Sequence, residues 1–517
     1  MKMIKYLGIL CLFLGLNGCS QDDSMDVSRE LNKVTFIGLN EKYSVTLYDY
    51  LNIPLSITTS SDEETPFSYL WYLSTATTRN EADTLSREKD LNVMIDPSHA
   101  TPGEDYTLTV KVTDETSGVY YRKDMKLEVL TEYTKGTLLL CEENGEAEVN
   151  FLTKEGERNL LENIYFRANS NHRVGKTPVK IYSVNPSEYY PDLKQELIFC
   201  QDGNGGMVAS PVSFEALSPV KDAFATSFSG EVLNPQLYFV GGMIDYIIIN
   251  GQVCKRGVNM GDLQWEAPLV CMDGVGNYEV APFVMEVDGV QTFYDRLNKR
   301  LLQHTRWNMG ALYQFDTENA DLSRFDCNAM GTNMEMEACG NLSETNAYWM
   351  LMRNSETRKL YIYKFRINNE GNFVSTLCEE IPETVAPHIY EAAYFASNSD
   401  YSDILVYATS EQVFAFSVNQ FTTNTSSSLE ALLVTPENQN TEITGMKFIT
   451  IQEETDQPDE TRSSLQIRLC IRNLSLPELQ GGVEFYEVSS QGGIHADFLF
   501  GKSGFCDTVI DIDEKYS

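Results

Sequence analysis

Short strand-like runs joined by tight turns recur along most of this chain, and they constrain its fold more than any other feature. Residues 137–141 form an apolar run, Asn144-Gly145 follows, and apolar residues then alternate with polar ones over residues 147–151. Asn250-Gly251 and Asp288-Gly289 join similar runs. Because Asn, Asp and Gly tolerate a positive φ angle, such pairs between two strands indicate β-hairpins. No long helical periodicity accompanies them, so the sequence predicts an all-β protein.

The hairpins continue without a break from residue 133 to residue 517, a segment too long for one compact core. Strands at this spacing fit a β-propeller, and blades of about 40–55 residues would give seven or eight of them. We predict a β-propeller over residues 133–517, with seven blades. A strand over residues 507–512 would complete the first blade, since a ring needs a clasp to avoid an open edge. The alternative architecture is a string of Ig-like sandwiches.

Residues 31–132 read as a separate β-sandwich. In Tyr69-x-Trp71 both large rings point to one face of a strand, where Trp71 can fill the core between two sheets. From Tyr106 to Val112 every second residue is apolar, and Gly103 and Asp114 mark the ends of this run. These residues predict an Ig-like domain in front of the propeller.

The N-terminus has the layout of a secretory signal, with Lys2 and Lys5, an apolar run over residues 6–16, and Gly18 before Cys19. The apolar run is shorter than the ~20 residues that a membrane-spanning helix needs. Leu-Asn-Gly-Cys fits a bacterial lipoprotein signal, so we predict a signal peptide over residues 1–18 and lipid attachment at Cys19. The alternative is an ordinary signal cut nearby. Residues 19–30 form an acidic linker.

The formal net charge of the chain is -36. A field of this sign repels phosphate backbones and anionic lipid surfaces. Nucleic acid is therefore excluded as a partner, and the lipid anchor is the predicted contact with the membrane.

The chain has eleven cysteines and no Cys-x-x-Cys pair, and its five histidines are scattered, which argues against a zinc site. Cys141, Cys200 and Cys470 lie in apolar runs and are expected in the core. Cys327 and Cys339, close together in a polar stretch, are the best candidates for a disulfide.

No nucleophile elbow, zinc-protease helix, phosphate loop or calcium loop occurs, so we predict no catalytic residue, no metal and no cofactor. One cluster combines a ring, a guanidinium and polar donors, and we predict that His304, Arg306 and Trp307 bind a ligand at the propeller face. The alternative is structural: Trp307 fills a blade core, and the basic residues pair with neighbouring acids.

Tyr69-x-Trp71 and the run from Gly103 through Tyr106 to Asp114 resemble the signature of polycystic-kidney-disease-type (PKD) Ig-like domains. Together with the lipoprotein signal and the long β-rich remainder, they resemble the PKD-like family lipoproteins of Bacteroidetes. That resemblance implies a surface lipoprotein associated with SusC/SusD-like uptake systems, and it carries no catalytic residues. The chain departs from the pattern after Val119, where charge is dense and the last strand of the domain is less clearly marked.

We therefore predict a non-catalytic lipoprotein, anchored in the outer membrane and exposed at the cell surface. It would serve a SusC/SusD-like nutrient uptake system as an accessory component that binds oligopeptide or glycan or docks onto the transporter. Two alternatives stand beside this prediction. One is a surface hydrolase or lyase with a propeller active site, and the other is a purely structural or adhesive module.

Overall fold

The computed structural model describes the chain from residue 32 to residue 515 with short gaps. The described residues are 32–60, 65–75, 83–96, 98–154, 158–184, 194–225, 232–241, 244–257, 264–272, 276–287, 289–304, 310–401, 403–419, 432–437, 440–454, 461–489 and 494–515. The chain divides into two compact units, of which the first ends at Thr131 and the second begins at Glu132. No helix among the described residues is long and apolar enough to cross a membrane.

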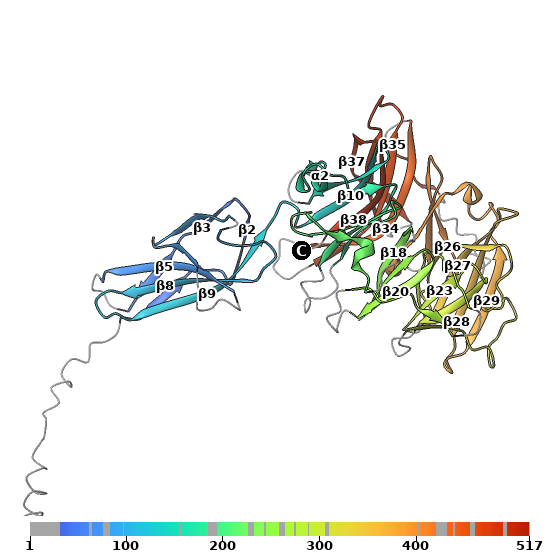
Figure 1. The fold of residues 1–517 in the computed structure, drawn as a ribbon, viewed down its shortest axis with the longest axis horizontal. Helices are drawn as coiled ribbons and strands as arrows, with labels where there is room; N and C mark the ends of the chain where they lie inside the picture. Colours follow the sequence, from blue (N-terminus) through green and yellow to red (C-terminus); the bar gives the residue numbers. More distant parts are fainter. Residues whose placement is uncertain are drawn as a thin grey trace, which may run out of the picture. The chain divides into compact units, whose positions relative to one another are not determined.

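In the part of the first unit that the structure describes, the regular elements are all strands (Figure 1). Its strands are β1 (Val34–Ile37), β2 (Lys42–Thr46), β3 (Tyr50–Ile53), β4 (Ser56–Thr59), β5 (Phe67–Ser74), β6 (Asp83–Ser86), β7 (Leu91–Met94), β8 (Tyr106–Asp114) and β9 (Tyr120–Leu130). One sheet has the order β2-β9-β8-β5-β6, and β1-β4 and β3-β7 form two-stranded sheets. One apolar core lies between them.

The predicted sandwich signature is explained by burial and turn chemistry. Trp71 is completely buried, and its indole nitrogen donates to the carbonyl of Lys89 at 3.2 Å. Leu108, Val110 and Val112 fill the same core. The buried carboxylate of Asp114 accepts hydrogen bonds from the next turn, from the amides of Thr116 and Ser117, and so it fixes the reversal into β9.

Strand β9 is the last strand of the first unit, which the dense charge after Val119 made hard to identify from the sequence. The structure shows an eleven-residue strand there, in which Met125, Leu127 and Val129 face the core. Asp124, Lys126 and Glu128 alternate with these positions and point to the opposite face of the sheet. Apolar residues therefore recur at every second position, as expected for a strand, but only in the second half of β9.

The second unit contains seven sheets in the part of the chain that the structure describes. The first three comprise β10 (Gly136–Glu143), β11 (Glu146–Thr153), β12 (Leu160–Leu161) and β13 (Gly175–Lys176) with β38 (Thr508–Lys515); β14 (Pro178–Val184), β15 (Gln195–Cys200), β16 (Gly206–Ala209) and β17 (Ala216–Pro219); and β18 (Pro235–Gly241), β19 (Ile244–Ile249) and β20 (Gln252–Gly257). The fourth and fifth comprise β21 (Val270–Cys271), β22 (Met285–Val287), β23 (Val290–Asp295), β24 (Arg300–His304) and β25 (Ala311–Gln314); and β26 (Met334–Asn341), β27 (Ala347–Asn354), β28 (Leu360–Ile367) and β29 (Phe373–Glu380). The last two comprise β30 (Tyr394–Ser397), β31 (Ile404–Ala408), β32 (Val413–Ser417) and β33 (Leu432–Val434); and β34 (Thr441–Glu454), β35 (Thr461–Asn473), β36 (Gly481–Ser489) and β37 (His495–Cys506). The connections hold the short helices α2 (Ile164–Ala168), η3 (Val220–Ala223), η5 (Ile389–Glu391) and η6 (Ser399–Tyr401).

Each sheet of the second unit packs on the next through its own apolar cluster. Representative members from the two facing sheets are Leu138 and Ile198, Leu197 and Ile247, Ile248 and Phe293, Tyr294 and Met350, Leu351 and Leu405, and Val406 and Ile467. A last cluster joins the seventh sheet to the first, with Cys470 and Phe485 on one side and Val509 and Ile512 on the other. Sheets packed face to face in a closed series make a propeller-like ring, and the all-β fold predicted from the sequence is confirmed.

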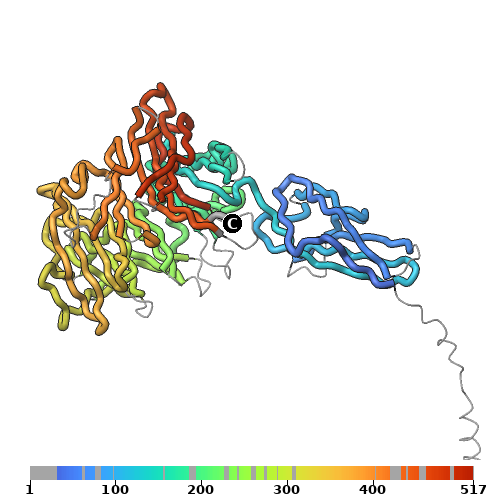
Figure 2. The backbone as a smooth tube through the Cα atoms, turned by 180° about the vertical axis from the view of Figure 1, so that it is seen from behind, coloured from blue at the N-terminus to red at the C-terminus, as the bar shows by residue number. Residues whose placement is uncertain are grey.

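The ring closes where the two ends of the unit meet. Strand β38 pairs antiparallel with β10, from Gly136 opposite Lys515 to Glu142 opposite Thr508. In Figures 1 and 2 the red C-terminal strands lie beside the teal strand β10. The predicted closing strand is confirmed. It covers the edge of the first sheet, which would otherwise be unpaired.

Charged side chains also tie the closing strand to its neighbours. The carboxylates of Asp511 and Asp513 accept hydrogen bonds from the backbone amides of Ile181 and Ser183 on β14, at 3.1 and 2.8 Å. Lys447 on β34 lies 3.3 Å from Asp511 and 3.7 Å from Asp513. Burial disfavours the ammonium, but the two carboxylates outweigh it and raise the pKa of Lys447. This lysine therefore stays charged and joins three sheets.

Two predicted hairpin turns have the expected backbone. Asn144 and Gly145 have φ angles of 55° and 80°, and Asn250 and Gly251 have 53° and 70°. All four lie in the region that favours type I′ turns. In the third pair Gly289 has a φ of 73°, and Asp288 lies outside the described residues.

Candidate functional site

A polar recess in the described part of the second unit opens over the seventh sheet, and we call it the β34–β37 recess. It has a volume of about 730 Å³. Its lining comes from the four strands of that sheet and from helix η6: Asp400, Tyr401, Thr450, Gln452, Arg462, Ser463, Ser464, Leu465, Glu487, Val488, Ser489 and Asp497. A volume of this size is typical of sites for small molecules.

Strand register pairs polar side chains on each face of the seventh sheet. In β34 and β35, Gln452 stands opposite Ser463, and the two side chains hydrogen-bond at 3.1 Å. The guanidinium of Arg462 lies 3.1 Å from the carboxylate of Glu487 on β36, and Ser464 donates to the same carboxylate at 3.3 Å. Arg462 remains 67% exposed, so its remaining donors face solvent.

Helix η6 contributes the aromatic side chain of the recess. Asn398 holds this segment against β34 by donating to the carbonyl of Phe448 at 3.3 Å and to the hydroxyl of Thr450 at 3.2 Å. Thr450 in turn donates to Asp400 at 2.6 Å. The ring of Tyr401 packs edge-on against Phe448 and stays half-buried. One phenol ring therefore stands beside an array of hydroxyls, an amide and carboxylates.

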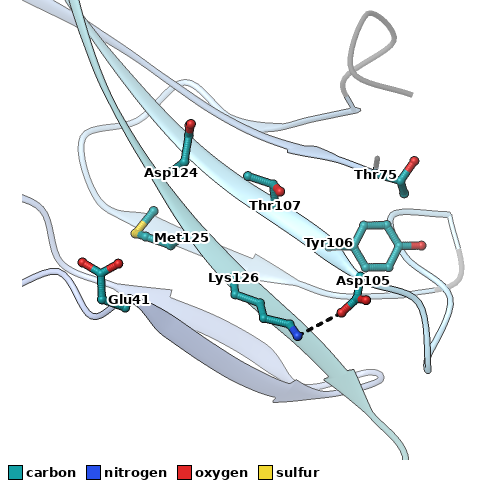
Figure 3. A pocket seen from close by; sticks show the side chains of 8 residues that line it. All are labelled: Glu41, Thr75, Asp105, Tyr106, Thr107, Asp124, Met125 and Lys126. Atoms are coloured by element: carbon teal, nitrogen blue, oxygen red, sulfur yellow. Dashed lines mark ion pairs between the residues drawn. The ribbon is translucent and has the colours of Figure 1, made fainter. Parts of the chain in front are cut away.

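A second hollow lies on the first unit, with a volume of about 480 Å³. Figure 3 shows the ammonium of Lys126 directed at the carboxylate of Asp105, and the two groups are 3.1 Å apart. Asp124 accepts a hydrogen bond from Thr109 at 2.8 Å. Both partners of the Lys126 pair are largely exposed, so water and salt screen it. This hollow is an open, hydrated strip of sheet, and it is a weaker candidate than the β34–β37 recess.

The structure describes only one of the residues predicted to contact ligand or lipid. Arg306 and Trp307 lie outside the described residues, and so does Cys19. His304 is 1% exposed, and its Nδ1 lies 2.8 Å from the hydroxyl of Tyr246. This burial leaves no exposed face of the ring for a ligand. The ligand-binding role of Arg306 and Trp307 stays a prediction.

The disulfide considered for Cys327 and Cys339 is wrong, because both cysteines are free. Cys327 is completely buried in an apolar cluster, where burial raises the pKa of its thiol to about 12. The thiol of Cys339 lies 3.6 Å from the carbonyl of Val284. In the part of the chain that the structure describes, no three His, Cys, Asp or Glu side chains gather as metal ligands would.

A comparison with known protein families matches the N-terminal part of the chain. Residues 19–178 match the model of the PKD-like family. The resemblance seen in the sequence is confirmed over this part of the chain, which reaches from the predicted anchor to the start of β14. No curated protein matches the chain.

Several solved structures are distantly similar. A quinoprotein alcohol dehydrogenase-like protein from Bacteroides thetaiotaomicron has a TM-score of 0.40 and 11% identity, and the alignment covers 93% of this chain and 99% of that one. The extracellular domain of a hybrid two-component system from the same organism has a TM-score of 0.35 and 10% identity, covering 71% and 45%. PorZ, a surface component of the type IX secretion system of Porphyromonas gingivalis, has a TM-score of 0.23 and 8% identity, covering 75% and 64%. Similarity at this level carries no argument about function.

Proposed function

We propose that this protein is a non-catalytic lipoprotein of the outer membrane, exposed at the cell surface, that binds a polar ligand in the β34–β37 recess. It would serve a SusC/SusD-like nutrient uptake system as an accessory component. The observation that carries the proposal is the recess itself, where Tyr401, Arg462 and a set of hydroxyl and amide groups line one hollow. An aromatic face with a few placed polar groups is the usual composition of a site for a polar organic ligand.

The charges of the recess restrict the classes of ligand that can bind there. Asp400, Glu487 and Asp497 oppose the single guanidinium of Arg462, so the lining carries two net negative charges. A ligand with several carboxylate or sulfate groups would be repelled, both by the lining and by the net charge of the whole chain. Neutral oligosaccharides and peptides with free amino groups fit this lining.

The location rests on the N-terminal sequence. Gly18 before Cys19 and the acidic residues that follow support a lipid anchor at Cys19. The match to the PKD-like family over residues 19–178 agrees with an exported protein. Docking onto a SusC/SusD-like transporter is implied by the family resemblance of the sequence.

A surface hydrolase is the second candidate, because three carboxylates from three different elements meet in the recess. Glycoside hydrolysis needs a pair of such groups, one as acid and one as base or nucleophile. Two of the three have other partners: Glu487 is paired with Arg462, and Asp400 accepts from Thr450. Asp497 is exposed on the edge strand β37. These contacts favour binding over catalysis.

Replacing Tyr401 or Arg462 with alanine is expected to weaken ligand binding about tenfold or more, since each change removes a contact worth more than about 1.4 kcal/mol. The measurement is isothermal titration of the mature chain with panels of neutral oligosaccharides and of oligopeptides, followed by chromatography of the ligand. Arg122→Ala is the matched control, because Arg122 is 61% exposed and also pairs with one carboxylate, in the first unit.

Equal loss of affinity in the Arg122→Ala control would contradict a site in the recess. Cleaved ligand in the chromatogram, abolished by Glu487→Gln, would instead establish the hydrolase. Recovery of intact ligand with affinity lost only in the recess variants is the result that the proposal predicts.

A further inference from the structure

Strands β3 and β7 of the first unit present an uncharged outer face. Their register sets Tyr50 opposite Met94 and Asn52 opposite Asn92. The residues between them, Leu51, Ile53 and Leu91 among them, are buried in the core of the unit, so these four side chains point outward. Tyr50 is 62% exposed and Met94 39% exposed.

Tyr48 adds a second exposed ring at the turn that leads into β3. The amide of Asp49 donates to the carbonyl of Thr46 at 2.9 Å, which closes a four-residue turn with Tyr48 in its third position. Tyr48 has a φ of 71°, in a region where glycine or asparagine is favoured and a bulky residue is an outlier. Its amide donates to the carbonyl of Ile95 at 2.7 Å, next to Met94.

Burial does not explain why a tyrosine occupies this position, since 62% of Tyr48 is exposed. A glycine would hold the same turn with less strain. Backbone strain of this kind clusters at binding and catalytic sites. Tyr48, Tyr50 and Met94 lie on adjacent, hydrogen-bonded segments and all three are exposed, whereas isolated exposed apolar residues need no explanation.

We infer that Tyr48, Tyr50, Asn52, Asn92 and Met94 form a second ligand-binding surface, the tyrosine platform, which binds a neutral polysaccharide chain. Two rigid phenol rings offer flat faces for the C–H faces of sugar rings, at little entropic cost. The side-chain amides of Asn52 and Asn92 both donate and accept, as sugar hydroxyls do. The four outward side chains of β3 and β7 carry no charge, in a chain of net charge -36. A neutral polymer is therefore favoured over an anionic one.

The test is affinity electrophoresis of the mature chain in gels that contain starch, xyloglucan or galactomannan, with polygalacturonate as the anionic probe. All samples carry Arg462→Ala, which weakens binding in the β34–β37 recess. A loss of retardation then reports on the tyrosine platform and can be distinguished from failure of the proposed function. The variant is Tyr48→Ala with Tyr50→Ala. Tyr120→Ala is the matched control, because Tyr120 is 58% exposed on β9 of the same unit.

At least one neutral polysaccharide is expected to retard the parent and the Tyr120→Ala control, and the double variant is expected to bind it about tenfold more weakly. Polygalacturonate should retard none of them. Absence of retardation in all neutral gels, or equal loss in the Tyr120→Ala control, would overturn the inference. If the platform binds a protein instead, the mobility of the parent and of all variants should be unchanged in every gel.

Tyr48→Gly separates binding from folding. Glycine relieves the backbone strain, so the melting temperature of the first unit should be equal or higher while retardation falls. A melting temperature that drops together with retardation would show that Tyr48 is structural and would contradict its role in the platform.

Discussion

A chain that ends at Cys506 is expected to lose the cooperative unfolding transition of the second unit. The missing residues include β38, which pairs with β10 along seven positions. Without β38, one edge of β10 is unpaired, and Val509 and Ile512 no longer cover Cys470 and Phe485. An uncovered apolar edge strand aggregates readily. Circular dichroism during heating, with binding of a dye to exposed apolar surface, measures the loss.

A peptide of residues 507–517 added in excess is the control, because it restores the missing strand without the covalent link. It should recover part of the transition. The first unit is expected to keep its own transition in the truncated chain. If the second unit melts as in the full chain without the peptide, β38 does not close the ring.

Replacing Arg468 with methionine is expected to lower the free energy of unfolding of the second unit by about 3–5 kcal/mol, the usual cost of breaking a buried ion pair on one side. Arg468 on β35 is 1% exposed. Its guanidinium lies 2.5 Å from Glu514 on β38 and 3.0 Å from the hydroxyl of Thr137 on β10, and it covers the ring of Phe485 at 4.4 Å. The variant leaves Glu514 buried without its cation. Denaturant unfolding followed by fluorescence measures the change.

Two further variants make this test specific. Adding Glu514→Gln to Arg468→Met removes the unpaired charge, so the double variant should be more stable than the single one. Lys359→Met breaks a pair with Glu380 in which both side chains are well exposed, and the unfolding midpoint should not move. Equal effects of Arg468→Met and Lys359→Met would contradict a buried clasp between the seventh sheet and the first.

Local patterns in the sequence predict much of this fold. Asn144-Gly145 and Asn250-Gly251 identify their hairpins because turn geometry depends on two adjacent residues. Trp71 identifies the sandwich because strand alternation places it on the core face. The closing strand follows from the need of a ring to cover its edges.

The environment of His304 could not be predicted in this way. In β24, Arg300, Leu301, Leu302 and His304 are all buried, because this strand has sheets packed on both faces. A strand buried on both faces shows no alternation from which the exposure of a polar residue can be read. Arg300 pairs with Asp295 at 2.9 Å, and the Nδ1 of His304 lies 2.8 Å from the hydroxyl of Tyr246.

The candidate sites were missed because they depend on register between distant segments. Tyr401 and Arg462 meet in one recess through η6 and β35, far apart in sequence, and Tyr50 meets Met94 only through the pairing of β3 with β7. One signal was available in the sequence: Arg462 and Ser463 follow an acidic, proline-bearing stretch. Strand pairing cannot be derived from composition or spacing alone.

The proposed role in an uptake system is tested most directly by the proteins that accompany this one in its membrane. The native protein would be purified by affinity from mildly solubilised outer membranes, and everything retained would be identified and quantified by mass spectrometry. We expect a SusC/SusD-like pair in amounts close to that of the protein. Recovery of the protein alone would contradict its proposed role as a docked accessory component.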